Sequence, residues 1–392
     1  MKWREMRVVK LVNTSLLLPE VKKRITISVS NDISTDQRVQ KQCRALQNEG
    51  YEIALYGRLL PNSKPVSRPY FMKRFKLLFN KGFLFYAALN TKLFFTLLFA
   101  KTDIYYANDL DTLPANYLAS LLRRKPLIYD SHEYFTEVPE IQNKPLVKSI
   151  WKFAERVCIG RCAIVMTVSG SIAELLQETY GLEKVFLVRN LPYEKINIQP
   201  YSKGEIGIDQ NQFLVVLQGA GINVDRGAEE LVEAMALVKN TTLLIIGDGD
   251  ALPLLKKMVG EMSLTETVIF KPKMPFDEMM RHTAAADLGV SLDKNTNLNY
   301  RFSLPNKIFD YALAEVPVLA SDLVEVKKLI LEFKIGEVLP EHSAKAIAQK
   351  LMELQADRSR LAEYKKNTKR LIESLNWQTE YKPVLEKMKT LG

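Results

Sequence analysis

The chain has 392 residues, with 55 Lys and Arg against 45 Asp and Glu, and a net charge of +10. This length predicts two domains, because a domain usually holds about 100–200 residues. With 47% hydrophobic and 26% charged residues, the composition is globular and excludes a disordered or collagen-like chain. Three cysteines, three histidines and no paired CxxC argue against a disulfide framework and a structural metal site, and favour a reduced, cytosolic compartment.

Two apolar stretches raise the question of export and membrane insertion. The run from Leu16 to Leu18 is too short for a signal-peptide core, and no small-residue cleavage site follows, so we expect no export. Residues 83–100 are interrupted by Asn90 and Lys92, and their length is at the lower edge of the ~17–25 residues that a spanning helix requires. We expect that this stretch does not span a membrane.

Short apolar runs that end in polar residues alternate with helical patterns along the whole chain. This alternation is typical of a parallel sheet covered by helices on both faces. The first half predicts five strands, at residues 25–30, 51–56, 104–107, 127–129 and 164–168, and the second half predicts five more, at 213–217, 243–246, 268–270, 288–292 and 318–320.

The predicted fold is therefore two doubly wound, Rossmann-like α/β domains in tandem. We expect an N-terminal domain at 1–192, a linker at 193–212, a C-terminal domain at 213–372 and a final helix at 373–392 that packs back on the first domain. Ligands of open parallel sheets bind beyond the carboxyl ends of the strands, so the cleft between the domains is the expected site.

The first strand of the second half ends in a glycine-rich turn that suits an anion. Gly219 and Gly221 let the backbone approach a ligand, a helix begins near Gly227, and Arg226 adds a full positive charge. The alternative is a tight turn with no ligand. Gly247 closes the next strand in the same way and is a weaker candidate on its own.

Residues 304–321, LPNKIFDYALAEVPVLAS, predict a loop, a helix entry and a strand. Asn306 is a good helix-entry residue, Lys307 is a cation beside the helix N-terminus, and Asp310 lies one turn further on. The run resembles the signature of the nucleotide-sugar-dependent glycosyltransferases of family 4, in which two acidic residues eight apart lead into a helix and a Pro-Val strand. The resemblance covers nearly the whole chain from about residue 25 and implies the GT-B fold.

The resemblance assigns expected roles to the C-terminal residues. Asp310 would hold the ribose hydroxyls of the donor, and Arg226 with Gly227 would contact the diphosphate, assisted by Lys307. In the family, the first acidic residue of the signature contacts the donor sugar. Here that position is Phe302, whose apolar ring cannot accept a hydrogen bond from a sugar hydroxyl. Three alternatives stay open for Phe302: another residue replaces the missing acid, backbone groups of residues 303–306 hold the sugar, or the protein prefers a different donor. A second basic residue of the family falls at Ala220.

Polar residues also follow three strands of the N-terminal half, so we expect them at one rim of the sheet. These strings are similar to those of a bacterial surface-polysaccharide subgroup of family 4. They supply possible acceptor or phosphate contacts at Asn31, Asp32, Arg38 and Asp109. The resemblance places His132 beside the donor sugar and the acceptor, where an imidazole can bond a hydroxyl or act electrostatically.

Each of these residues has a plainer interpretation. His132 could be a loop histidine that caps the next helix, and Arg38 could pair with Asp36 or Glu49. Asp109 and Asp111 form the D-x-D pattern that metal-dependent sugar transferases of another fold use for a divalent cation. We expect them instead to begin a helix, because the resemblance implies a site without a bound metal and without a required cofactor.

From Arg58 to Lys101 the chain has no acidic residue, nine positive charges and many Phe, Tyr and Leu residues. Such a segment resembles an interfacial element that binds an anionic membrane peripherally. The alternative is a helix whose apolar face packs on the sheet and whose lysines are solvated. No nucleic-acid-binding motif accompanies the positive charge, so we expect no nucleic-acid partner.

Together these features predict a retaining, metal-independent glycosyltransferase at the cytoplasmic face of the membrane. It would move a sugar from a nucleoside diphosphate sugar to a saccharide or lipid-linked acceptor in cell-surface polysaccharide synthesis. Two alternatives stay open. One is a sugar-nucleotide epimerase or a phosphorylase of similar shape, and the other is a non-catalytic membrane-surface scaffold in which Phe302 marks a decayed site.

Overall fold

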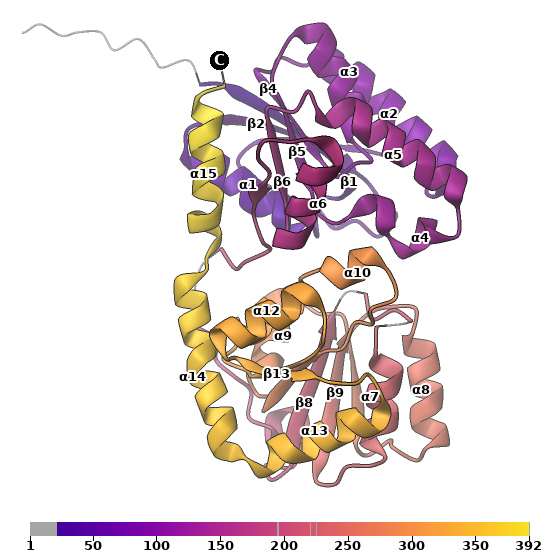
Figure 1. Ribbon diagram of the computed structural model, residues 1–392, viewed down its shortest axis with the longest axis vertical. Coiled ribbons are helices and arrows are strands. Elements are labelled where there is room, and N and C mark those ends of the chain that lie inside the picture. The colour runs from indigo at the N-terminus through magenta and orange to yellow at the C-terminus, as the bar shows by residue number, and fades with distance from the viewer. Residues whose placement is uncertain (1–21, 194–195, 220, 225, 392) are drawn as a thin grey trace, which may run out of the picture.

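A computed structural model describes residues 22–193, 196–219, 221–224 and 226–391, which fold into two α/β domains (Figure 1). The N-terminal sheet contains, in spatial order, β3 (Phe71–Phe75), β2 (Glu52–Arg58), β1 (Arg24–Asp32), β4 (Ile104–Asn108), β5 (Leu127–Ser131), β6 (Ile164–Thr167) and β7 (Phe186–Leu187). The C-terminal sheet contains β10 (Val268–Pro272), β9 (Thr241–Gly247), β8 (Phe213–Gly219), β11 (Leu288–Ser291), β12 (Val318–Ser321) and β13 (Gly336–Leu339).

All paired strands are parallel, which confirms the predicted pair of doubly wound sheets. The ten expected strands are present. Strands β3, β7 and β13 were not predicted; they lie at sheet edges and are only partly buried. β3 falls inside the segment from Arg58 to Lys101, so part of that segment is an edge strand.

Helices cover both faces of the sheets. In the N-terminal domain they are α1 (Gln37–Asn48), α2 (Gly82–Phe99), α3 (Leu113–Arg123), α4 (Pro139–Gln142), α5 (Pro145–Ile159) and α6 (Gly170–Tyr180), with the 3-10 turn η1 (Phe135–Glu137). The remaining ones are η2 (Gly204–Ile206), α7 (Ala228–Met235), α8 (Leu252–Glu261), α9 (Phe276–Thr283), α10 (Leu298–Phe302), α11 (Asn306–Leu313), α12 (Val324–Phe333), α13 (Ala344–Ala356), α14 (Arg358–Ser374) and α15 (Trp377–Lys389).

The strand order reverses once in each sheet. β1 lies between β2 and β4, and β8 lies between β9 and β11. Crossovers therefore leave in opposite directions from these strands, which opens a crevice at their carboxyl ends where ligands of such sheets bind. The polar residues that the sequence analysis selected follow β1, β4, β5 and β8, so the fold brings them to these two reversal points.

Helix α15 follows the C-terminal domain in sequence but packs on the N-terminal one. In Figure 1, α14 lies along the C-terminal domain and α15 continues alongside the N-terminal domain. Trp377 and Tyr381 are fully buried in the same apolar cluster as Ile25 and Tyr106. The α15 residue Glu380 also forms an ion pair with Arg189. The chain therefore crosses between the domains twice, and its last helix completes the N-terminal core.

Candidate active site

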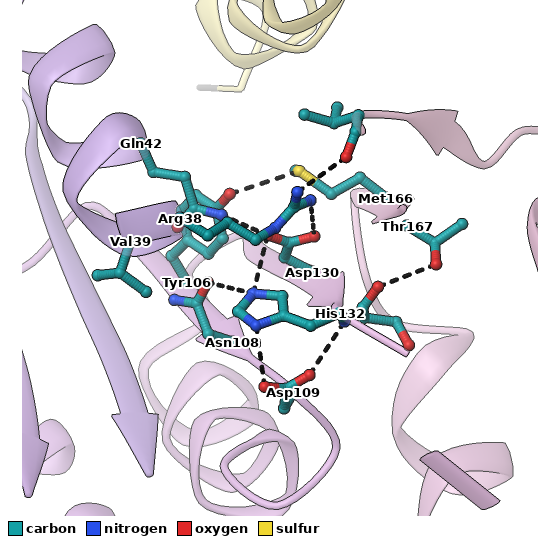
Figure 2. A network of polar contacts seen from close by, with 12 residues as sticks. Arg38, Val39, Gln42, Tyr106, Asn108, Asp109, Asp130, His132, Met166 and Thr167 are labelled. Carbon is teal, nitrogen blue, oxygen red and sulfur yellow. Dashed lines mark hydrogen bonds and ion pairs between the residues drawn. The ribbon is translucent and has the colours of Figure 1, made fainter. Parts of the chain in front are cut away.

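His132 is the centre of a polar network at the carboxyl ends of β4 and β5 (Figure 2). Its Nδ1 lies 3.0 Å from Asp109 Oδ2, and its Nε2 lies 3.2 Å from Asp130 Oδ2 and 3.1 Å from Asn108 Oδ1. Burial alone would lower the pKa of His132, but the carboxylates of Asp109 and Asp130 outweigh it and raise the pKa well above the usual value. The charged form of the ring is therefore favoured, and its contacts are carboxylate and amide oxygens.

Arg38 holds the far side of this network. Its Nε and Nη2 donate to the two oxygens of Asp130 at 2.8 and 2.7 Å, and its Nη1 donates to the Val188 carbonyl at 2.8 Å. The guanidinium is 5% exposed, and Arg38 and His132 together lower the pKa of Asp130 in spite of its burial. Arg38 therefore pairs with Asp130 and not with Asp36 or Glu49, whereas its expected phosphate contact stays a prediction. Its donors bond Asp130, the Val188 carbonyl and the side-chain oxygen of Asn190.

The other N-terminal candidates lie at neighbouring strand ends. Asp109 has a left-handed backbone (φ +62°), and its Oδ1 accepts the His132 backbone N–H at 3.0 Å, so it fixes the loop as well as the ring. Asp32 closes a turn by accepting the Ser34 N–H at 2.9 Å, and Asn31 beside it is exposed.

Two carboxyl groups adjoin His132, one on the buried Asp111 and one on the partly buried Glu133. Burial, reinforced by the negative charge of Asp109, raises the pKa of Asp111 to about 7 and the pKa of Glu133 to about 7. A carboxyl group that titrates near neutrality can be protonated or ionised at physiological pH. Asp111 precedes α3, whose N-cap residue is Thr112. The rim around His132 therefore carries two carboxyl groups with raised pKa values, which sequence spacing alone could not predict.

In the C-terminal domain, Arg226 and Lys307 converge on one carboxylate. Arg226 Nη1 lies 3.5 Å from Asp293 Oδ1, and Lys307 Nζ lies 3.5 Å from Asp293 Oδ2. Arg226 also lies over the ring of Tyr300. Asp293 is almost fully buried just beyond the carboxyl end of β11, whereas the two cations come from the turn after β8 and from the first turn of α11. The fold thus brings together two cations that are 81 positions apart in sequence.

Asp310 lies one turn further along α11. Its Oδ2 accepts a hydrogen bond from Gln218 Nε2 at 3.2 Å. Gln218 is the penultimate residue of β8, just before the glycine-rich loop. Burial raises the pKa of Asp310 to about 6, against the opposing effects of the Gln218 amide and of the positive charge of Lys41 in α1. Asp310 therefore faces the N-terminal domain. Asn306 is exposed as the first residue of the same helix.

The glycines of the two loops have different reasons to be glycine. A side chain at Gly219 or Gly221 would meet its nearest neighbour at 3.8 or 3.7 Å, so these positions have room in front of the backbone. Gly227 is the left-handed N-cap of α7 (φ +74°), and a Cβ there would lie 2.2 Å from the Leu292 carbonyl oxygen. Gly247 (φ +144°) packs its Cα against Gly219. Ala220 lies outside the described residues.

Replacing Gly247 with alanine is expected to lower the free energy of unfolding by about 2–4 kcal/mol. The added Cβ would lie 1.8 Å from the Gly219 carbonyl oxygen, so the contact between β8 and β9 must open. Gly260 in α8 is the matched control, since no atom lies within 4 Å of its Cβ position. Alanine there should raise the free energy of unfolding by about 0.5–1 kcal/mol. Urea unfolding measures both, and equal effects would contradict this packing argument.

The two halves of the site contact each other through Asn299 of α10. Its Oδ1 accepts the Tyr134 N–H at 2.9 Å, and its Nδ2 donates to Glu133 Oε2 at 3.2 Å, next to His132. Phe302, at the end of the same helix, packs against the apolar core of the N-terminal domain. The position that the resemblance gives to an acidic residue is therefore an apolar contact between the domains.

A second interdomain contact lies at α6. Glu325 Oε1 of α12 accepts hydrogen bonds from the backbone N–H and the hydroxyl of Ser171, at 2.7 and 2.6 Å. A carboxylate at a helix N-terminus is favourable because the unpaired N–H groups carry partial positive charge. The structure thus places the His132 network against the Arg226 and Lys307 side of the C-terminal domain.

Sequence reasoning missed Asp293, Glu133 and Asn299. Asp293 directly follows the predicted strand 288–292, which is the same signal that selected Asp109, so it could have been found. Glu133 stands next to His132, but only the fold shows that it is partly buried and bonds Asn299 of the other domain. Asn299 carries no sequence signal, because its role depends on contacts with residues more than 160 positions away.

Two family models match the chain. One, described as Glycosyltransferase Family 4, matches residues 36–190, and the other, described as Glycosyl transferases group 1, matches residues 213–357. The chain belongs to glycosyltransferase family 4. The two matches coincide with the two sheets, so each half of the site lies in a recognised half of the family architecture.

Individual relatives agree with this membership. The chain is 24% identical over 264 residues to an alpha-D-kanosaminyltransferase of Streptomyces kanamyceticus, an alignment that covers 63% of this chain and 66% of that protein. A sucrose-phosphate synthase from Thermosynechococcus elongatus shares the fold with a TM-score of 0.77 at 16% identity, over 94% of this chain and 99% of that one.

Anabaena HepE in complex with UDP-glucose has a TM-score of 0.73 at 17% identity, over 94% of this chain and 100% of that chain. At such identities these structures establish the shared GT-B fold.

Proposed function

We propose that the protein transfers a sugar from a nucleoside diphosphate sugar to a saccharide or lipid-linked acceptor, with retention of the anomeric configuration, in cell-surface polysaccharide synthesis. The observation that carries the proposal is the convergence of Arg226 and Lys307 on Asp293, opposite the His132 network. Family membership and the likeness to HepE, which is titled as a complex with UDP-glucose, support a donor of this class.

The two cations are suited to hold a diphosphate. Asp293 balances their charge in the structure described, and a diphosphate arriving in front of them would offer more oxygens for charge-assisted hydrogen bonds. Gly219 and Gly221 leave space for it, and Asp310 is placed to accept hydrogen bonds from ribose hydroxyls on the same side. As the bond from the sugar to the diphosphate breaks, Arg226 and Lys307 stabilise the charge on the leaving group.

His132 acts as a fixed cation in this proposal. Both ring nitrogens point at acidic or amide oxygens, so the imidazolium has no free lone pair with which to remove a proton. The acceptor hydroxyl forms its bond to the anomeric carbon as the diphosphate departs, and its proton passes to the leaving phosphate on the same face. His132, with 15% of its side chain exposed, holds the loop and its charge beside this exchange.

Domain movement belongs to the same proposal. Asn299 bridges to Glu133 and Tyr134, and Glu325 bridges to Ser171, so the two domains contact each other around the site. Opening these contacts admits the donor, and closing them excludes water, which favours transfer over hydrolysis. The contacts of Asn299 and Glu325 consist of a few hydrogen bonds. Replacing them with hydrogen bonds to water therefore costs little free energy when the domains open.

A thermal-shift screen with UDP, GDP, ADP and their common sugar conjugates tests the donor site. A ligand that binds only the folded protein stabilises it by about 2.7 kcal/mol at one hundred times its Kd, so at least one of these nucleotides should raise the Tm by several degrees. The absence of any shift across the screen would contradict the proposal and favour a non-catalytic scaffold.

The stabilising sugar nucleotide then goes into a transfer assay with and without saccharide or lipid-linked acceptors. The proposed transferase forms a new glycoside only with an acceptor present, and mass spectrometry and NMR give its size and anomeric configuration. An isomerised sugar nucleotide in the assay without acceptor would identify an epimerase instead.

A further inference from the structure

Large hydrophobic side chains are exposed mainly on one part of the N-terminal domain. Most of those in the described residues lie on α2, α3 and α5, namely Phe83, Leu84, Phe95, Phe99, Leu118, Leu121, Leu122, Leu146, Val147, Ile150, Phe153 and Val157. The three helices contact one another and lie along one flank of the domain in Figure 1. A concentration of exposed apolar side chains on one flank marks an interaction surface.

Helix α5 has two apolar faces. Trp151, Cys158 and Ile159 are buried against the domain, whereas Ile150 and Phe153 lie on an opposite, exposed stripe with Leu146 and Val157. The exposed stripe repeats at intervals of three and four residues, which is the spacing of a single helix face. No described element covers this face, so the sequence of α5 encodes a second apolar contact that the domain itself does not use.

Helix α2 repeats the arrangement. Phe85, Leu89, Leu93 and Leu97 are buried at intervals of four residues, but only 22% of this largely apolar helix is buried. By length and composition α2 could cross a membrane, and it is the one helix of the described residues that could. Its buried stripe anchors it in the core of the N-terminal domain, which leaves its outer faces to lie along a surface.

The exposed charges on these three helices have one sign. Among them α2, α3 and α5 contain a single acidic residue, Glu155, and it is buried. Exposed cations lie on the helices or at their ends: Lys81, Lys92, Lys101, Arg123, Arg124, Lys144 and Arg156, together with Lys152, which is paired with Glu137. The arginines of the segment from Arg58 to Lys101 do not join them, because Arg58 bonds Asn80, Arg68 bonds Tyr70 and Arg74 bonds the Lys64 carbonyl.

We propose that the outer faces of α2, α3 and α5, with the cations around them, form one surface that docks on an anionic phospholipid bilayer. The surface gives the membrane contact expected from the sequence a defined set of residues. The inference rests on the proposed transfer to a lipid-linked acceptor. It narrows the contact within the segment 58–101 to α2 and adds α3 and α5. A second copy of the chain fits the surface poorly, because two such surfaces would place like charges face to face.

The position of the surface suits delivery of an acceptor from the bilayer. In a parallel α/β domain each helix begins near the carboxyl end of the strand before it, so α3 begins near Asp109. Residues 132–144 likewise connect His132 to the start of α5. The three-helix surface therefore starts at the edge of the domain that carries the candidate site, within reach of a lipid-linked sugar.

Vesicle sedimentation of the full chain tests the surface without any nucleotide sugar. The wild-type protein should bind vesicles of equal parts phosphatidylcholine and phosphatidylglycerol, and less well at high salt. The variant Ile150→Gln/Phe153→Gln should bind at least about tenfold more weakly, because two apolar side chains no longer enter the interface. Lys101→Gln and Lys144→Gln should each weaken binding about fivefold, and only to the anionic vesicles.

The matched control is Leu237→Gln/Leu331→Gln in the C-terminal domain. Its side chains are 51% and 60% exposed, against 52% for Ile150 and 69% for Phe153, so both pairs remove similar exposed apolar groups. The control should bind like wild type, and so should Arg226→Ala, which separates docking from transfer. Unchanged binding by the Ile150 and Phe153 variant would overturn the proposal. The proposal would also be overturned if light scattering showed that the wild-type protein is a dimer and that this variant is a monomer, because the surface would then join two copies of the chain.

Discussion

Replacing Arg226 with alanine is expected to weaken nucleoside diphosphate binding about 10–100-fold and to lower kcat/KM for transfer about 10²–10³-fold. A hydrogen bond to a charged group contributes about 1.5–3 kcal/mol, and removing a donor that acts on developing charge costs more in the transition state than in binding. Isothermal titration with the nucleotide found in the thermal-shift screen gives the first number, and initial rates of transfer give the second.

Arg358→Ala is the control for this experiment. Arg358 lies over the ring of Phe213 at the start of β8. Its replacement by alanine therefore removes the same charge as Arg226→Ala, but at the opposite end of the sheet. Lys307→Ala should resemble Arg226→Ala. Because both cations contact Asp293, the effects of the two single variants should not add in the double variant. If Arg226→Ala binds nucleotide as tightly as Arg358→Ala does, the proposed diphosphate site is wrong.

Replacing His132 with glutamine is expected to lower kcat about 10²–10³-fold and to destabilise the protein in a pH-dependent way. The variant loses the cation between Asp109 and Asp130, and we expect a loss of about 2 kcal/mol, since Asp130 keeps Arg38 as a partner. Transfer rates and urea unfolding at several pH values measure the two effects.

The sign of the pH dependence follows from the raised pKa of His132. A histidine whose pKa is higher in the folded state contributes its full stabilisation below the unfolded value of 6.5 and loses it as the pH rises through the folded value. The stability difference between wild type and His132→Gln should therefore be largest below pH 6.5 and shrink at alkaline pH. A difference independent of pH would contradict an imidazolium at this position.

His282→Gln is the control for the His132 variant. His282 is also buried, but its Nδ1 bonds the Glu278 carbonyl one turn earlier in α9, so it is part of a helix in the C-terminal domain. Its replacement can cost stability but should leave kcat unchanged. A similar loss of kcat in both variants would mean that the effect of His132→Gln is structural.

The fold could be predicted from the sequence because its central strands are continuous apolar runs. Strands such as β4 and β9 are buried along their whole length, so every residue contributes to the same signal. The edge strands β3 and β13 alternate between buried and exposed residues or are only half buried, and the charged residues Lys73 and Arg74 in β3 read as part of a surface segment. Edge strands need the neighbouring strand to identify them.

The candidate site was predictable where local sequence determines the position, and not where a distant partner does. Arg226, Lys307 and Asp310 could be selected from a loop and a helix entry. Nothing near Arg38 indicates that it ends on Asp130, 92 positions away, where two buried charges satisfy each other. In the same way, Phe302 was expected as a missing carboxylate, and only the fold shows it as an apolar contact with the other domain.

The position of α15 also has a consequence for biosynthesis. The ribosome makes the N-terminal sheet first, but the indole of Trp377, which is stacked on Tyr381 in the core of that domain, emerges only after the entire C-terminal domain. Until then the first domain exposes the apolar face that α15 will cover, so it must wait for the last helix while the second domain can already fold. Truncation before α15 should therefore damage the domain farthest from it in sequence.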